Sequence, residues 1–143
     1  MKKDFIRDYA TGAFIRYASL GCPTREEYEE KLRRDVYNRL SLKEPRIILM
    51  KADAEIASRK PILDDIEAVE KMFAMLEANG KEYISKAVRA VYFASAVGRP
   101  SRKEIVNRVL CYARSVPIDE RSVYRWLKYA RELFAMLRGL TIE

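Results

Sequence analysis

Histidine is absent from the 143 residues of this chain, and cysteine occurs only at Cys22 and Cys111. The lack of histidine excludes Ser-His-Asp and Cys-His nucleophiles, zinc sites with histidine ligands, and acid–base catalysis by an imidazole. The two cysteines lie 89 positions apart, which excludes a disulfide scaffold and a four-cysteine metal site. We interpret both as free thiols in a reducing cytoplasm.

Long apolar stretches are missing as well. The longest run of small and apolar residues, Ala90 to Val97, is far shorter than the ~20 residues that cross a bilayer. The first residues are basic, but an acid and an arginine follow before any apolar stretch begins, which is not the pattern of a signal peptide. We therefore expect a cytoplasmic protein with no membrane partner.

Motifs for catalysis or cofactor binding are equally scarce. Each of the five glycines stands alone, so none forms a glycine-rich loop that could hold phosphate groups. Asp64 and Asp65 could be considered as metal ligands, but sequence neighbours on a helix point in different directions, and acidic residues suit the first turn of a helix. The sequence therefore predicts no enzyme, no cofactor and no metal site.

The chain is rich in strong helix formers and shows no sustained alternation of apolar and polar residues, so we predict an all-α fold. Thr24 with Glu27 and Ser101 with Glu104 match the capping-box pattern, and Asp119 is an expected N-cap. Glycine and proline mark most helix ends. The expected helices span residues 4–20, 25 to the break at Pro45, 46–59, 61 to the stop at Gly80, 82–97, 102–114 and 120 to the end at Gly139.

A boundary is expected near Lys60 and Pro61. Residues 1–60 are predicted to form a helical arm, and residues 61–143 a compact four-helix unit. The segment 82–97 is apolar around most of its circumference and should be the central helix of that unit. The arm carries apolar stripes without an evident partner in the C-terminal unit, which suggests a homodimer formed through the arm; these stripes include Tyr9, Tyr17, Tyr28 and Val36.

Positive charge is concentrated toward the C-terminus. The chain has 28 Lys and Arg against 21 Asp and Glu, a net charge of +7. The window from Arg99 to Arg131 holds nine basic and three acidic residues, and so carries +6 of that charge. A basic stripe confined to one pair of helices is typical of a surface that binds nucleic acid, and it also occurs as a plain solvated surface.

The same window has the outline of a helix-turn-helix at about residues 102–138, with Pro117 in the turn. If positions 123, 127, 130 and 134 face inward, the N-terminal half of the second helix presents donors outward, as a recognition helix does. We assign Arg121 and Arg125 to base or near-base contacts, and Lys128 and Arg131 to the DNA backbone. The full set of expected contacts with double-stranded DNA is Arg121, Ser122, Tyr124, Arg125, Lys128, Arg131, Arg102, Lys103 and Arg108.

The segment 117–140 has the sequence PIDERSVYRWLKYARELFAMLRGL. It resembles the C-terminal signature of the ArpU/RinA group of phage and prophage transcriptional regulators, in which an Ile-Ser-Glu-Arg-Thr-Val-Tyr-Arg-like stretch opens the recognition helix. Asp119 and Ser122 replace the Ser and Thr of that stretch. The group is related to the helix-turn-helix of sigma-factor region 4, but the segment 102–114 is longer than the first helix of such modules.

The resemblance implies a prophage-encoded regulator of late or morphogenetic genes, which binds promoter-proximal DNA in the cytoplasm of a bacterial host and has RNA polymerase as a further expected partner. Two other interpretations stay open. One is a phage assembly or packaging component, similar to a small terminase subunit, that uses the same helix-turn-helix in an oligomer. The other is a helical protein-interaction module whose basic face binds an acidic protein.

Overall fold

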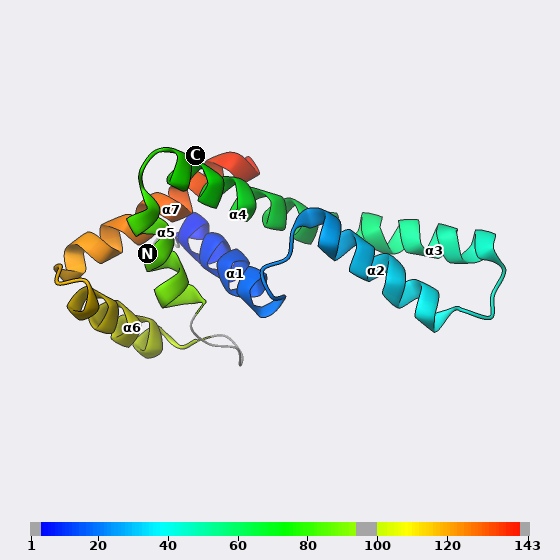
Figure 1. Cartoon of the computed structure of the whole chain (residues 1–143), viewed down its shortest axis with the longest axis horizontal. Helices are drawn as coiled ribbons and strands as arrows, with labels where there is room; N and C mark the ends of the chain where they lie inside the picture. Colours follow the sequence, from blue (N-terminus) through cyan, green and yellow to red (C-terminus); the bar gives the residue numbers. More distant parts are fainter. Residues whose placement is uncertain (1–3, 94–99, 141–143) are drawn as a thin grey trace. The chain divides into compact units, whose positions relative to one another are not determined.

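The computed structural model describes residues 4–93 and 100–140, and every regular element in these two ranges is an α-helix (Figure 1). This confirms the predicted all-α class. The helices are α1 (Phe5–Ser19), α2 (Arg25–Arg39), α3 (Pro45–Ser58), α4 (Lys60–Ala78), α5 (Glu82–Tyr92), α6 (Arg102–Ser115) and α7 (Glu120–Arg138). None of these helices is long and apolar enough to cross a membrane.

Local capping explains where α2 and α6 begin. At α2, the Thr24 hydroxyl accepts the Glu27 N–H at 3.1 Å, and the Glu27 carboxylate accepts the Thr24 N–H at 3.1 Å, so the predicted capping box is complete. At α6, the Ser101 hydroxyl accepts the Glu104 N–H at 3.2 Å. The Glu104 carboxylate, however, accepts the Ser101 hydroxyl and pairs with Arg108, so the reciprocal backbone bond predicted here does not form.

The chain folds as two compact units. The larger unit contains the residues up to Cys22 and those from Ala68 onward, whereas the hairpin unit contains Pro23–Glu67. Helix α4 contributes its first residues to the hairpin unit and the rest to the larger unit. This division differs from the predicted boundary near Lys60 and Pro61, because α1 belongs with the C-terminal helices.

Helix α5 lies against α1, α6 and α7. Its buried face includes Ile84 and Val91, while Tyr83 and Lys86 lie on an exposed face. The expectation that this helix is apolar around most of its circumference is therefore wrong. Residues 94–97 of the predicted helix lie outside the described residues.

Aromatic contacts explain why α1 joins the larger unit. The rings of Tyr9 and Phe134 lie 6.3 Å apart, and those of Phe14 and Phe134 lie 5.4 Å apart, edge to face. The Tyr17 ring lies 5.8 Å from that of Phe93. Tyr9 and Tyr17 thus have partners among the C-terminal helices, contrary to the sequence-based expectation that they have none.

In the hairpin unit, α2 and α3 run beside each other (Figure 1). Tyr28, Leu32 and Val36 form the buried stripe of α2, and Ile48 and Ala52 that of α3. Each pair of neighbouring stripe residues is four positions apart, the spacing that keeps side chains on one face of a helix. Most other residues of the two helices are exposed, and they include charged side chains as well as large apolar ones, so this unit has a narrow apolar core.

Candidate nucleic-acid interface

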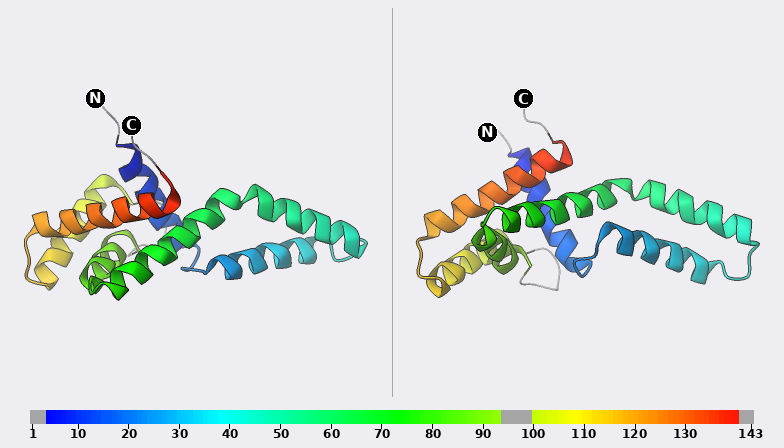
Figure 2. Two further views of the ribbon diagram at one scale, coloured as in Figure 1. Left: turned by 90° about the horizontal axis from the view of Figure 1, so that it is seen from above. Right: turned by 45° about the horizontal axis from the view of Figure 1, so that its top comes forward.

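Helices α6 and α7 contact each other and are joined by a short connection, residues 116–119 (Figure 2). Pro117 has no backbone N–H and cannot continue α6. The next N–H, that of Ile118, donates to the Ala113 carbonyl at 2.9 Å. The Ile118 side chain packs against the core of the larger unit. These two contacts anchor the turn and fix where α7 begins.

Asp119 caps the N-terminus of α7, as predicted. Its carboxylate accepts the Ser122 N–H at 2.9 Å. Hydrogen bonds from the hydroxyl and the backbone N–H of Ser122, together with the nearby charges of Arg125 and Arg121, hold the pKa of Asp119 below its usual value. The carboxylate is therefore charged at neutral pH and engaged with the helix terminus, where negative charge is stabilising.

The N-terminal half of α7 presents three exposed cations on one side. These are Arg121, Arg125 and Lys128, whose spacings of four and three residues place them together; we call them the basic face. Tyr124 lies at the edge of this face and is 40% exposed. Glu132, which was not among the predicted residues, lies 3.9 Å from the Lys128 ammonium, so the charge of Lys128 is partly offset and those of Arg121 and Arg125 dominate the face.

Two predicted contact residues have other roles. Ser122 is buried, not on the outer surface, and its hydroxyl accepts a hydrogen bond from Arg125 Nη2 at 3.0 Å. The Arg108 side chain is only 17% exposed, and its Nη1 donates to the Val91 carbonyl at 2.8 Å near the end of α5. Ser122 thus orients Arg125, and Arg108 joins α6 to α5; neither faces outward.

The remaining predicted residues divide between α6 and α7. Arg102 and Lys103 are exposed in the first turn of α6. Arg131 is partly buried, and its Nη1 donates to the Tyr92 hydroxyl at 2.9 Å, so it does not share the basic face. Arg99, which was counted in the basic window, lies outside the described residues.

A cleft of about 530 Å³ lies beside the basic face, with walls from α1, α5, α6 and α7. It brings together three of the predicted residues, Arg102, Tyr124 and Arg131, with Arg7 and Asp8 of α1. The sequence gives no sign of this arrangement, because no local pattern indicates that residues of α1 and of the start of α6 line one cleft.

Comparisons of the chain with protein-family models, with curated proteins and with solved structures found no match. Within residues 117–140, Asp119 caps α7, Ser122 orients Arg125, and Arg121 and Arg125 are exposed.

Proposed function

We propose that this chain binds double-stranded DNA sequence-specifically through the basic face of α7 and regulates transcription. The observation that carries the proposal is the position of the three cations. They lie together in the N-terminal half of a capped helix, the second of a helix-turn-helix, which is the part of a recognition helix that reaches base edges in the major groove.

The chemistry of the three side chains suggests separate roles. Arg121 and Arg125 can each donate two hydrogen bonds to O6 and N7 of guanine. The hydrogen bond with Ser122 restrains the Arg125 guanidinium before DNA binds, which lowers the entropic cost of ordering it. Lys128 suits a phosphate oxygen as a point charge. Arg102 and Lys103, exposed at the start of α6, suit further backbone contacts.

The biological role rests on the resemblance alone. It suggests a prophage regulator of late or morphogenetic genes that acts near a promoter, with RNA polymerase as a partner in the cytoplasm of a bacterial host. Selection of bound sequences from random duplex DNA would identify the preferred site and allow the following measurements.

The main test is the affinity of Arg125→Ala for the selected site. Loss of a bidentate base contact is expected to cost about 1–3 kcal/mol and to relax the preference at one base pair. The control is Lys86→Ala, which also removes one positive charge, from an exposed position on α5 outside the basic face, and should bind as the unmodified chain does. Equal affinities of the two variants, with unchanged circular dichroism, would show that the basic face is only a solvated surface.

A salt series separates base contacts from phosphate contacts. Lys128→Ala is expected to weaken binding to specific and scrambled duplexes alike and to reduce the slope of log K against log salt by about one. Because Glu132 lies near the ammonium, Glu132→Gln should strengthen binding to both duplexes slightly. A loss confined to the specific duplex in Lys128→Ala would contradict this assignment.

We further propose that a second copy of the chain pairs with the hairpin unit. Large apolar side chains gather near the α2–α3 connection, where Tyr37 is 59%, Leu42 99%, Leu49 60% and Met50 71% exposed. Exposed apolar patches mark interaction surfaces. Two helical hairpins can pair as a four-helix bundle, and a dimer can read paired half-sites.

The substitution Met50→Asp tests this pairing. It should shift the molar mass measured by light scattering from that of a dimer to that of a monomer. A monomeric unmodified chain, free and on DNA, would contradict the pairing, and a multi-subunit ring would favour the small-terminase-like alternative.

A further inference from the structure

The cleft beside the basic face has an excess of positive charge. Three arginines line it, Arg7 from α1, Arg102 from α6 and Arg131 from α7, against one carboxylate, that of Asp8. That carboxylate lies 3.3 Å from Nε of Arg7. Within residues 4–93 and 100–140, neither Arg102 nor Arg131 forms an ion pair with a carboxylate. Among the described residues, no carboxylate therefore compensates the charges of these two arginines.

Arg131 is held in place although it has no carboxylate partner. Its Nη1 donates to the hydroxyl of Tyr92 at 2.9 Å, and Tyr92 is itself buried, with its ring 5.6 Å from that of Phe14. A guanidinium has five N–H donors, and this bond uses one of them. Placing a cation in a partly buried position is costly unless an anion compensates it. A fixed, partly buried arginine that faces a cleft is thus prepared for an anionic ligand.

The other walls of the cleft are apolar and aromatic. Ile105 and Val106 of α6, Leu127 of α7 and the two tyrosines, Tyr92 and Tyr124, contribute to the lining. The volume of about 530 Å³ falls in the range of about 300–1,000 Å³ that is typical of small-molecule sites. A ligand that matches these walls combines an anionic group with a flat, largely apolar body.

We infer that this cleft binds an aromatic phosphate with the chemistry of a nucleoside monophosphate. Arg102 and Arg131 bind the phosphate, and the base lies against the exposed ring of Tyr124, since aromatic faces stack well on bases. Such a group is available from a free nucleotide or from the 5′-phosphorylated end of a nucleic-acid strand. The inference goes beyond the proposed duplex binding, because the cleft lies beside the basic face and includes none of its three residues. The two proposals share Arg102, and the loss of duplex affinity in Arg125→Ala tests the duplex proposal separately.

Calorimetric titration of the full chain with adenosine 5′-monophosphate tests the inference, with adenosine as the matched probe that lacks phosphate. The nucleotide should bind, and adenosine should bind at least tenfold more weakly. Arg131→Gln and Arg102→Gln should each reduce nucleotide affinity by about tenfold, as expected for loss of a charge-assisted hydrogen bond. Tyr92→Phe, which frees Arg131, should reduce it by about threefold.

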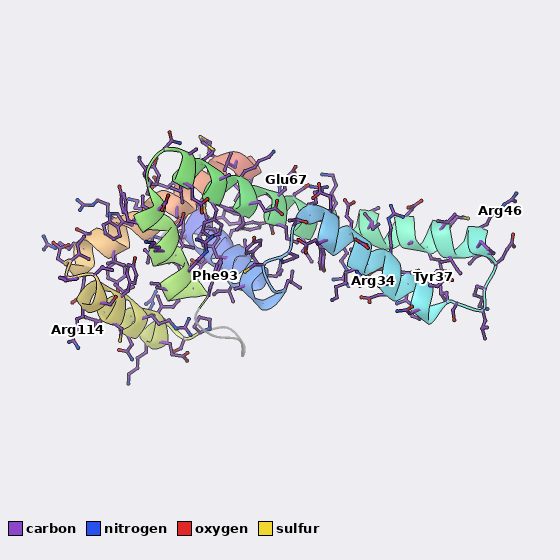
Figure 3. All side chains as sticks on the ribbon, viewed as in Figure 1. Arg34, Tyr37, Arg46, Glu67, Phe93 and Arg114 are labelled. Carbon is purple, nitrogen blue, oxygen red and sulfur yellow. The ribbon has the colours of Figure 1, made fainter. Side chains whose placement is uncertain are left out.

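Controls separate a binding defect from a folding defect or a change of net charge. Arg102 is exposed and forms no hydrogen bond with another described residue, so its substitution should not disturb the fold. Arg114→Gln removes a charge from an exposed position near the end of α6 that lies outside the cleft (Figure 3), and should leave nucleotide affinity unchanged. An equal loss in Arg114→Gln, or equal binding of adenosine and its monophosphate, would overturn the inference.

A second arm of the experiment separates the two sources of the phosphate. A short single-stranded oligonucleotide is compared with and without a 5′-phosphate, using the unmodified chain and Arg102→Gln. Suppose that the unmodified chain prefers the phosphorylated strand, that Arg102→Gln abolishes this preference, and that the free nucleotide does not bind. The cleft is then assigned to strand ends. Binding of the free nucleotide with no preference between the strands assigns it to a small molecule. No binding of any of these probes at millimolar concentration would overturn the inference, whatever the outcome for duplex DNA with Arg125→Ala.

Discussion

The larger unit and the hairpin unit are built from helices of similar length, but they bury side chains to different extents. In the larger unit, Phe14, Val88 and Phe134 are completely buried within one continuous cluster. In the hairpin unit, α2 buries three of its 15 residues and α3 two of its 14. Helix α6 of the larger unit buries only two residues, but α5 and α7 bury six each. Since hydrophobic stabilisation scales with the apolar area removed from water, the larger unit obtains most of it through α5 and α7.

Ion pairs are more prominent in the hairpin unit. Nη1 of Arg25 lies 2.8 Å from the carboxylate of Asp64 and 3.1 Å from that of Glu67, and a second pair joins Arg33 to Asp53 across α2 and α3 at 3.0 Å. Ion pairs near the surface contribute less than buried apolar side chains. We therefore expect substitutions in the core of the larger unit to lower the free energy of unfolding most. Substitutions in exposed ion pairs of the hairpin unit should lower it least.

The largest expected effect is that of Phe134→Ala. This side chain is 0% exposed and its ring lies 5.4 Å from that of Phe14, so its removal should leave a cavity and cost about 3–5 kcal/mol of unfolding free energy. Denaturant unfolding measures the loss. Met136→Ala, on the same helix at a position 63% exposed, is the control and should change stability little. Equal midpoints for both variants would contradict the assigned core.

Leu32→Ala should have a smaller effect, confined to the hairpin unit. Leu32 is 8% exposed and belongs to the narrow core between α2 and α3, which can close over part of the cavity, so about 2 kcal/mol is expected. Hydrogen exchange followed by mass spectrometry should show faster exchange in residues 25–58 and unchanged exchange in α5. Leu42→Ala, at a position 99% exposed, serves as the control. A similar acceleration of hydrogen exchange in α5 would show that the cores of the two units are not independent.

Arg25→Ala should lower the free energy of unfolding by about 1 kcal/mol. The carboxylates of Glu29, Asp64 and Glu67 lose their shared partner, at a position that is only partly exposed. The loss should appear as faster hydrogen exchange in α2. Arg25→Lys keeps the charge without the planar guanidinium and should restore part of the protection.

Acid should weaken the same ion-pair network. Hydrogen bonds from Lys60 and Arg25 lower the pKa of Asp64, so the folded state stabilises the charged carboxylate relative to the unfolded chain. That stabilisation is complete above the ordinary carboxyl pKa of ~3.9 and is lost as the pH falls through the lower folded value. Protection of α2 from hydrogen exchange should thus decrease below about pH 4. The decrease should be less steep in Arg25→Ala. The same pH dependence in both chains would contradict the role of Arg25 in lowering the pKa of Asp64.

The smallest effect is expected for Arg33→Ala. The Arg33–Asp53 pair lies 3.0 Å apart, but its side chains are 48% and 68% exposed, so solvent and salt screen it and the loss should stay within about 0.5 kcal/mol. Urea unfolding at low and high salt measures it. A loss as large as that of Arg25→Ala would show that exposure does not rank the ion pairs of the hairpin unit.

Much of the secondary structure could be predicted from short-range patterns. The Thr24–Glu27 capping box, the Asp119 cap and the stop at Gly139, where φ is 80°, are interactions between residues at most four positions apart. Such signals act whatever the rest of the chain does. The exposure of Arg121, Arg125 and Lys128 likewise followed from helical periodicity, once positions 123, 127, 130 and 134 were assigned to the core.

The sequence by itself therefore determined the helices, most of their ends and the exposed cations of α7; the predicted helix 82–97 instead ends at Tyr92. Only the tertiary structure decided that α1 joins the C-terminal helices, that Arg108 donates to the Val91 carbonyl, and that Arg102 and Arg131 meet Arg7 across a cleft. The physical reason is the range of the interactions. Caps and periodicity depend on neighbours within one or two turns, whereas the packing of one helix face on another depends on shape and burial between residues far apart in the chain.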